Sequence, residues 1–402
     1  MKRQVAGLWG VVMVLALLVS ACAAGATQDD ADAAELRIAV MLDEAGIGWA
    51  DSDGSRESLH EQVRRGLLQV AEAHNGFFAD RRNADRQETD RQEIDFGNQV
   101  ELALAVVEAG SHGHEQRLRS MASAGYQLVI GVGMGFSEAV VKVARDLPET
   151  HFVLVEGELP DAEEQPNLTV VQFAENEGAF LAGALAGMML PDLGGGSLGF
   201  ITAMDLPQTR VKEAGFTAGV MFANSDLRTS DAVVARSLSQ DPTAFQDPPA
   251  AAEAARELYG DGVRIIFHSA GASSEGIFVA AYEQRRWAIG ASTDQGIVYA
   301  EANTAQERAI GERIVTSVLK RFDSVLARVC DEFIESGGAL GNGYRRYGIA
   351  DEAFSLAVNR FNDELLAPYR ERLAEMKELV SSGDLSVPQV TADIEAWAEG
   401  TF

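Results

Sequence analysis

Three loops rich in glycine or small polar residues each follow a strand-like run, and the first two precede a helical pattern, so they carry groups suited to contacting a ligand. Their sequences are "GVGMGF" (Gly131–Phe136), "HSAGASSEG" (His268–Gly276) and "AIGASTDQG" (Ala288–Gly296). Backbone N–H groups at a helix start, hydroxyls and carboxylates can all hydrogen-bond a polar solute. The first loop has Phe136 where a dinucleotide fingerprint needs glycine, and the second lacks the Gly-Lys-Ser/Thr of a phosphate loop. We therefore predict solute binding rather than nucleotide chemistry.

Catalysis and metal binding are not indicated by the remaining polar residues. His112 and His114 lie close together, but no cysteine or acid pattern completes a zinc site around them. No Ser-His-Asp arrangement stands out. Cys330 lies on the apolar stripe of a helical pattern, which is typical of a packed free thiol. We predict no enzyme, no cofactor and no metal.

The elements that would position these loops alternate between strand and helix, which predicts parallel sheets with crossover helices. A chain of 402 residues exceeds the size at which a single core stops growing, so two α/β lobes are expected. Strand-like runs span 36–42, 103–107, 127–131, 151–155, 168–173, 197–202, 232–236, 263–268 and 287–291. Helical patterns span 58–73, 115–124, 137–146, 178–190, 210–222, 249–259 and 275–285.

The C-terminal third is expected to begin with one long helix, from about Ala305 to Ser336. Short strands around 344–349 and 354–358, a charged helix over 363–381 and a tail should follow. The stretch 75–98 is rich in Arg, Asp, Glu and Gln and lacks an apolar period. It is either a mixed-charge excursion or an extension of the preceding helix.

Charge and the N-terminal residues bear on partners and location. A formal net charge of -28 argues against nucleic acid and against broad adhesion to anionic lipid. Lys2 and Arg3 precede a short apolar run that ends in "LVSAC", which is typical of a secretory signal over 1–21. The cysteine resembles that of a bacterial lipobox, so lipidation of Cys22 is expected, and residues 22–35 read as a flexible tether. A plain signal with an incidental cysteine is the alternative.

Several longer blocks resemble the basic membrane protein family, the purine nucleoside receptor A-like lipoproteins that serve ATP-binding-cassette importers. The match lies in the order and spacing of the blocks over most of the chain after the signal. They are "QLVIGVGMGFSEA", "VVQFAENEGAFLAGALAGMM", "LGFITAM", "KEAGFTAGV", "AFQDP", "IIFHSAGASSEGIF", "IGASTDQ", "IVTSVLKRFDSV" and "VSSGDLSVP".

The resemblance implies a type I periplasmic binding protein with two Rossmann-like lobes and a ligand cleft at the hinge. It places lobe 1 at 36–175 and 305–343, and lobe 2 at 176–304 and 344–402. It further implies a monomer that delivers a purine nucleoside or nucleoside-like solute to permease and ATPase subunits. A receptor for another small polar ligand, such as a sugar or signal molecule, and a surface adhesin or sensory lipoprotein are the alternatives.

The implied binding residues in the first half depart partly from the family pattern. Asp43 matches the family's first aspartate, and Glu138 stands where an aspartate is usual. Leu59 and His60 replace a phenylalanine and an asparagine, while Trp49 lies in a short insertion before them. His60 and Trp49 can both stack on a ring, so both are expected in the binding site.

The implied binding residues in the second half are better preserved. Phe245 matches an aromatic that would stack on a base, Gly271 borders the cleft, and Lys320 matches a lysine that helps to hold the sugar. In "IGASTDQ" the family usually has a first acid where Ser292 stands, while Asp294 is retained. Because a serine accepts hydrogen bonds more weakly than a carboxylate, we expect an altered, nucleoside-like ligand.

Overall fold

The computed structural model describes residues 36–43, 59–80, 92–95, 100–107, 111–157, 159–160, 162–229 and 232–402. The expected signal peptide, Cys22, the tether and Trp49 lie outside these ranges. The chain divides into two compact units, 1–44 with 64–170 and 327–344, and 45–63 with 171–326 and 345–402. Within the described residues, none of the helices is long and apolar enough to cross a membrane.

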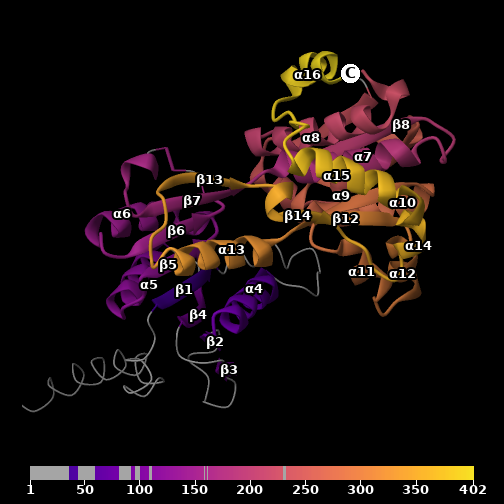
Figure 1. The fold of residues 1–402 in the computed structure, drawn as a ribbon. Coiled ribbons are helices and arrows are strands. Elements are labelled where there is room, and N and C mark those ends of the chain that lie inside the picture. The colour runs from indigo at the N-terminus through magenta and orange to yellow at the C-terminus, as the bar shows by residue number, and fades with distance from the viewer. Residues whose placement is uncertain are drawn as a thin grey trace, which may run out of the picture. The chain divides into compact units, whose positions relative to one another are not determined.

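The first sheet has eight strands in the order β13-β7-β6-β5-β1-β4-β2-β3 (Figure 1). β1 (Leu36–Asp43) pairs in parallel with both neighbours, and six of its eight residues are buried. Such a continuous apolar run is typical of a parallel strand covered on both faces. The other strands are β2 (Phe77–Asp80), β3 (Gln92–Asp95), β4 (Val100–Val107), β5 (Leu128–Val132), β6 (His151–Val155), β7 (Leu168–Phe173) and β13 (Gly343–Tyr347). Helices α4 (Leu59–Ala73), α5 (Ser111–Ser123) and α6 (Ser137–Asp146) come from the same half of the sequence.

The second sheet has six strands in the order β14-β12-β11-β10-β8-β9. All are parallel except β14, which runs antiparallel to β12. The strands are β8 (Ser197–Met204), β9 (Val233–Ser239), β10 (Val263–Ser269), β11 (Trp287–Ser292), β12 (Ile314–Lys320) and β14 (Phe354–Leu356). The helices after β7 are α7 (Glu175–Met189), α8 (Pro207–Ala223), α9 (Pro248–Gly260), α10 (Ser274–Gln284), α11 (Gln295–Ala300), α12 (Ala305–Gly311), α13 (Phe322–Glu335), α14 (Asp363–Leu366), α15 (Arg370–Ser381) and α16 (Ile394–Thr401). The fold class expected from the sequence, α/β with parallel sheets, is confirmed.

The expected long helix over 305–336 is wrong. The chain there forms α12, then β12, then α13. β12 carries Ile314, Val315, Thr316 and Val318, whose branched side chains favour a strand, and it pairs with β11 and β14. Because of this pairing, residues 305–326 belong to the second unit, whereas the sequence analysis assigned them to lobe 1.

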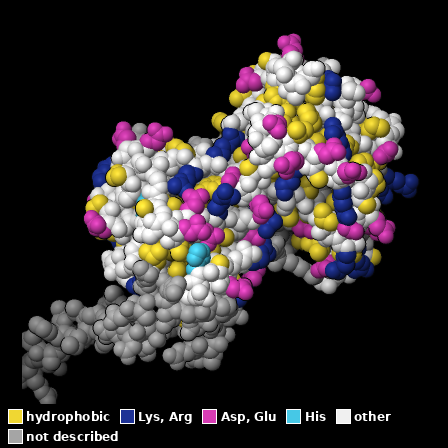
Figure 2. All heavy atoms as spheres, viewed as in Figure 1, with side chains coloured by type: hydrophobic (Ala, Val, Ile, Leu, Met, Phe, Trp, Pro, Cys, Tyr) yellow, Lys and Arg dark blue, Asp and Glu magenta, His cyan; other side chains and the backbone are white. Residues whose placement is uncertain are grey.

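The charged stretch 75–98 contains two strands that the sequence analysis did not predict. β2 pairs in parallel with β4, and β3 pairs antiparallel with β2. β3 is the terminal strand of its sheet. Charged residues are common on such edge strands, because they discourage pairing with another chain. Figure 2 shows acidic and basic side chains interspersed over the visible surface.

Helices α7 and α8 approach each other closely through glycines. A methyl group on Gly183 would overlap the carbonyl oxygen of Phe216, and one on Gly219 would overlap that of Phe180. Gly215 faces the backbone of Asn176 in the same way. α7 is buried on nearly all sides, which agrees with the apolar sequence that follows its polar first turn. The glycines therefore fix how near the two helix backbones lie.

Gly219→Ala should destabilise the protein by about 1–3 kcal/mol, the usual cost of forcing extra atoms into a packed interior. Gly260→Ala is the control. Gly260 also lies in a helix, as the last residue of α9, but a methyl group there meets nothing within 4 Å. Urea unfolding of both variants measures the difference. An equal stability of the two variants would show that the α7–α8 contact tolerates a wider spacing.

Candidate functional site

A pocket opens in the second unit where the strands of the six-stranded sheet end. Open α/β sheets bind ligands at this carboxyl edge. The strands β10, β11, β12 and β14 contribute to the pocket, together with α7 and α8. Its lining residues are Glu175, Ala179, Lys212, Phe267, Ala291, Ser292, Val318, Lys320 and Phe354.

Glu175 lies between two lysines in this pocket. Lys320 Nζ is 2.6 Å from Glu175 Oε1, and Lys212 Nζ is 3.4 Å from Glu175 Oε2. The exposed fractions of the side chains are 22% for Glu175, 9% for Lys320 and 20% for Lys212. Burial by itself favours the neutral acid, but the two ammonium groups outweigh it and lower the pKa of Glu175 to about 2. The glutamate is therefore ionised at neutral pH.

Lys320 is the last residue of β12 and contacts two aromatic rings. Its Nζ lies 4.6 Å from the ring centre of Phe173 and 5.5 Å from that of Phe322. Phe173 and Phe322 in turn pack with ring centres 5.0 Å apart. An aromatic face attracts a cation, and the attraction grows when water is excluded. These contacts hold the Lys320 ammonium at the pocket wall.

Ser292 ends β11 with a backbone φ of +69°, in the left-handed region that few residues other than glycine adopt. Such a conformation costs free energy and persists where the surroundings impose it, often at a binding site. Gln295 imposes part of it, because its Oε1 accepts a hydrogen bond of 2.8 Å from the N–H of Ala291. A side chain at Gly290 would collide with Gln295, so the glycine is needed here.

Gln295 also connects the neighbouring strand ends. Its Oε1 lies 3.2 Å from His268 Nε2, its Nε2 donates to Ser274 Oγ, and its backbone N–H donates to Ser317 Oγ. Burial lowers the pKa of His268 to about 4, so the ring is neutral at pH 7. Since Nδ1 accepts from the N–H of Ala270, we assign the ring proton to Nε2, which then donates to Gln295. The network fixes the ends of β10, β11 and β12 relative to one another.

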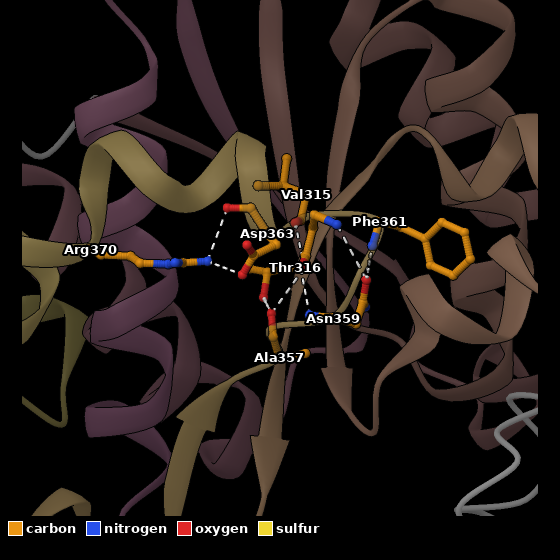
Figure 3. Close-up of polar contacts among 8 residues, drawn as sticks. Val315, Thr316, Ala357, Asn359, Phe361, Asp363 and Arg370 are labelled. Atoms are coloured by element: carbon orange, nitrogen blue, oxygen red, sulfur yellow. Dashed lines mark hydrogen bonds and ion pairs between the residues drawn. The ribbon is translucent and has the colours of Figure 1, made fainter.

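The chain after β14 supports β12 from its outer side (Figure 3). Thr316 Oγ1 donates to the carbonyl of Ala357 over 2.7 Å, and Asn362 Nδ2 donates to the carbonyls of Val315 and Ala357. Asn359 Nδ2 donates to Asp294 Oδ2 over 2.8 Å, while Asp294 Oδ1 caps α11 at the N–H of Ile297. Both carboxylate oxygens of Asp294 thus hold the loop after β11 in place.

Phe245 and Gly271 lie together at the ends of β9 and β10. Phe245 belongs to the short helix η6 (Pro242–Gln246), and Gly271 opens η7 (Gly271–Ser273). A methyl group on Gly271 would come within 3.3 Å of the Phe245 ring, so the ring packs against this glycine. Ser273 Oγ donates to the carbonyl of Ala244, which ties the two loops together. Phe245 remains partly exposed.

The expected residues of the first half lie apart from this pocket in the sequence, and the structure gives close contacts for Asp43. Asp43 ends β1 with 5% of its surface exposed, and His114 Nε2 is 3.2 Å from its Oδ1. A methyl group on Gly135 would overlap the Asp43 carboxylate, so the "GVGMGF" loop wraps around this side chain. Glu138 is exposed in the first turn of α6, and His60 in α4 is 2% exposed.

Glu175 and Lys212 were not among the residues expected from the sequence. Both lie in blocks that carry the family resemblance, "AENEGAFLAG" and "KEAGFTAGV". An isolated acid or lysine at the start of a helix usually faces solvent, so neither stands out in the sequence alone. Only the packing of α7 against α8 brings the two side chains together beside Lys320.

A family of ABC transporter substrate-binding proteins, described as PnrA-like, matches residues 69–388. This range covers well over half of the chain. The chain belongs to this family. The resemblance drawn from the ordered sequence blocks is thereby confirmed. A substrate-binding protein of this kind binds a small molecule and delivers it to a transporter that has permease and ATPase subunits.

Two relatives each align with about two thirds of this chain. A CD4+ T-cell-stimulating antigen of Listeria monocytogenes is 25% identical over 69% of this chain and 74% of its own length. A nucleoside-binding protein of an ABC transporter from Lactococcus lactis subsp. cremoris is 24% identical over 66% of this chain and 72% of its own length.

Solved structures support the fold. A solute-binding protein of an ABC transporter system from Aeropyrum pernix superposes with a TM-score of 0.58 at 19% identity, covering 90% of this chain and 98% of that one. A second, from Conexibacter woesei, gives a TM-score of 0.58 at 20% identity, covering 88% of this chain and 99% of that one. The chain therefore has the type I fold of periplasmic solute-binding proteins.

Glu175→Gln should destabilise the protein at neutral pH by about 2–3 kcal/mol. This is less than the ~3–5 kcal/mol lost when a fully buried pair is broken, because the Glu175 side chain is 22% exposed. The folded-state pKa of about 2 lies below the ordinary value of 4.5. The stabilisation is therefore complete above pH 4.5 and is lost as the pH falls towards 2.

The measurement is urea unfolding of wild type and Glu175→Gln at several pH values between 7 and about 2.5, where the titration of such a carboxyl falls. The difference in stability should shrink as the pH falls. Asp205→Asn is the control, since Asp205 pairs with Arg210 at an exposed position and contributes little. A difference for Glu175→Gln that does not change with pH would contradict the assigned charge.

Proposed function

We propose that this substrate-binding protein is a lipid-anchored extracytoplasmic receptor of an ABC importer and that it binds a purine nucleoside or a nucleoside-like solute. The observation that carries the proposal is the family match over residues 69–388. The name of the Lactococcus lactis relative, a nucleoside-binding protein, supports this class of ligand. The pocket at the carboxyl edge of the six-stranded sheet supplies groups that suit it.

The polar end of the pocket suits the hydroxyl groups of a sugar. Lys320 and Lys212 donate hydrogen bonds only, whereas Glu175 accepts only, and a hydroxyl group can do both. Ser292 adds one donor and a weaker acceptor. Phe267 and Phe354 supply apolar wall, so the pocket combines a few polar groups with hydrophobic surface in the manner of small-molecule sites.

We assign the stacking of the ring to Phe245, which is partly exposed at the same sheet edge and backed by Gly271. Asp294 acts indirectly in this proposal, because its carboxylate caps α11 and accepts from Asn359. It thus positions the loop that contains Ser292. Asp43 and Glu138 are proposed as further polar contacts, as the family resemblance implies, each from its own place in the first half of the chain.

Phe245→Ala should weaken the binding of adenosine or inosine by about 1–3 kcal/mol, the range for a base stacked on an aromatic side chain. Titration calorimetry on protein freed of copurified ligand measures this change. Phe361→Ala is the control, since Phe361 is 51% exposed and follows β14. Unchanged affinity in Phe245→Ala would remove this residue from the site, and no heat with any nucleoside would reject the nucleoside ligand.

Cys22→Ala should release the protein from the membrane fraction. Diacylation of Cys22 is the proposed anchor, and stable membrane attachment needs two acyl chains, which the variant cannot carry. Mass spectrometry of the mature N-terminus measures the modification directly. Cys330→Ala is the control, as this cysteine is buried in α13. An unmodified N-terminus cut at another residue would contradict the anchor.

A further inference from the structure

The pocket of the second unit carries an excess of positive charge. Among its nine lining residues the ionisable ones are Glu175, Lys212 and Lys320, that is, two ammonium groups and one carboxylate. The whole chain has a formal net charge of -28, so this local excess runs against the composition of the protein. A pocket with a net positive charge attracts a negatively charged ligand.

The two lysines are held differently. Lys320 Nζ contacts Glu175 at 2.6 Å and faces two aromatic rings, whereas Lys212 Nζ is 3.4 Å from the carboxylate. Charge-assisted hydrogen bonds between nitrogen and oxygen are normally about 2.7–2.9 Å long. Both lysines stabilise the carboxylate, but Lys320 makes the shorter hydrogen bond to it. Lys212 makes the longer contact and is more exposed, at 20% against 9% for Lys320, so its ammonium group can turn N–H donors towards a further anion.

Ser292, which lines the same pocket, does not balance the excess positive charge. Ser292 lines the pocket at the end of β11, where the resemblance to the family implies an acid. With an aspartate there, two carboxylates would match two ammonium groups. With serine, one negative charge is missing from the pocket, and a ligand can supply it.

We propose that the ligand carries an acidic group, a phosphate monoester or a carboxylate, which binds Lys212 beside the Glu175–Lys320 pair. The proposal rests on the proposed function and narrows it to a nucleoside-like anion. The acid completes two pairs of opposite charges within the pocket. Ser292 Oγ donates a hydrogen bond to the same group, a contact that an aspartate could make only when protonated.

Titration calorimetry with three probes tests the proposal: adenosine, adenosine 5′-monophosphate and adenosine-5′-carboxylic acid. The two acids should bind wild type about tenfold more tightly than adenosine, which corresponds to one charge-assisted hydrogen bond. Their advantage should fall only modestly as salt is added, because a partly buried charge pair is screened less than an exposed one. A preference for only one acid would identify whether phosphate or carboxylate is the natural group.

Variants of the pocket separate charge from shape. Lys212→Met should weaken both acids about tenfold and adenosine less than about twofold, while Lys212→Arg should keep most of the affinity for acids. Arg210→Met removes a positive charge from the same helix, where Arg210 pairs with Asp205. It should change neither the affinity for the acids nor the affinity for adenosine. Ser292→Asp should make adenosine bind more tightly than the two acids. Aspartate tolerates the left-handed backbone at this position.

Equal binding of acids and adenosine to wild type would overturn the proposal and leave nucleoside binding intact. So would an equal loss for acids and adenosine in Lys212→Met. If none of the three probes binds, the nucleoside assignment fails, and inorganic phosphate then decides on the anion site. Greater thermal stabilisation of wild type than of Lys212→Met by phosphate would support the anion site, and equal stabilisation would reject it.

Discussion

The backbone contact between α7 and α8 determines the chemistry of the pocket. Glu175 begins α7, and Lys212 lies in the second turn of α8. Gly215 lets α8 approach the backbone of Asn176, the residue next to Glu175. A wider separation of the helices would move Lys212 away from the carboxylate. The glycines at the contact between the two helices therefore set a distance between two charged groups, although they contribute no charge themselves.

The charged groups are surrounded by neutral anchors that fix their positions without competing for their charge. His268 is uncharged because burial lowers its pKa to about 4, and Gln295 carries no charge at any pH. Together they hold the ends of three strands by hydrogen bonds. A second ionised group among these anchors would weaken the interaction of Glu175 with its lysines. A site arranged in this way is rigid before the ligand arrives, which reduces the entropy lost on binding.

Elements with a clear apolar period and clear ends could be predicted from the sequence, and elements without them could not. β6 and α6 were predicted with their observed bounds, because a clear apolar period and a turn delimit each one. β12 was hidden, since only a few residues separate it from α12 and α13 and the apolar positions run on without a proline. Its cluster of branched side chains was the available signal.

Residues of the candidate pocket could be expected where a family motif marks their position. Lys320 and Ser292 were expected, and the structure brings both to one pocket. Glu175 and Lys212 could not be found in this way, because their roles depend on a helix contact between residues 37 positions apart in sequence. Asp294 was expected to touch ligand, but the sequence gives no indication that Asn359 lies beside it.

The support of β12 by the chain after β14 has a consequence for biosynthesis. Each compact unit is assembled from separate stretches of the sequence, and the second one requires residues 345–402. Until these residues leave the ribosome, β12 has no partner on its outer side, and Asn362 is not present to satisfy the carbonyl of Val315. An exposed strand edge of this kind is prone to aggregation. Folding of the second unit therefore cannot be complete until its last residues have been synthesised.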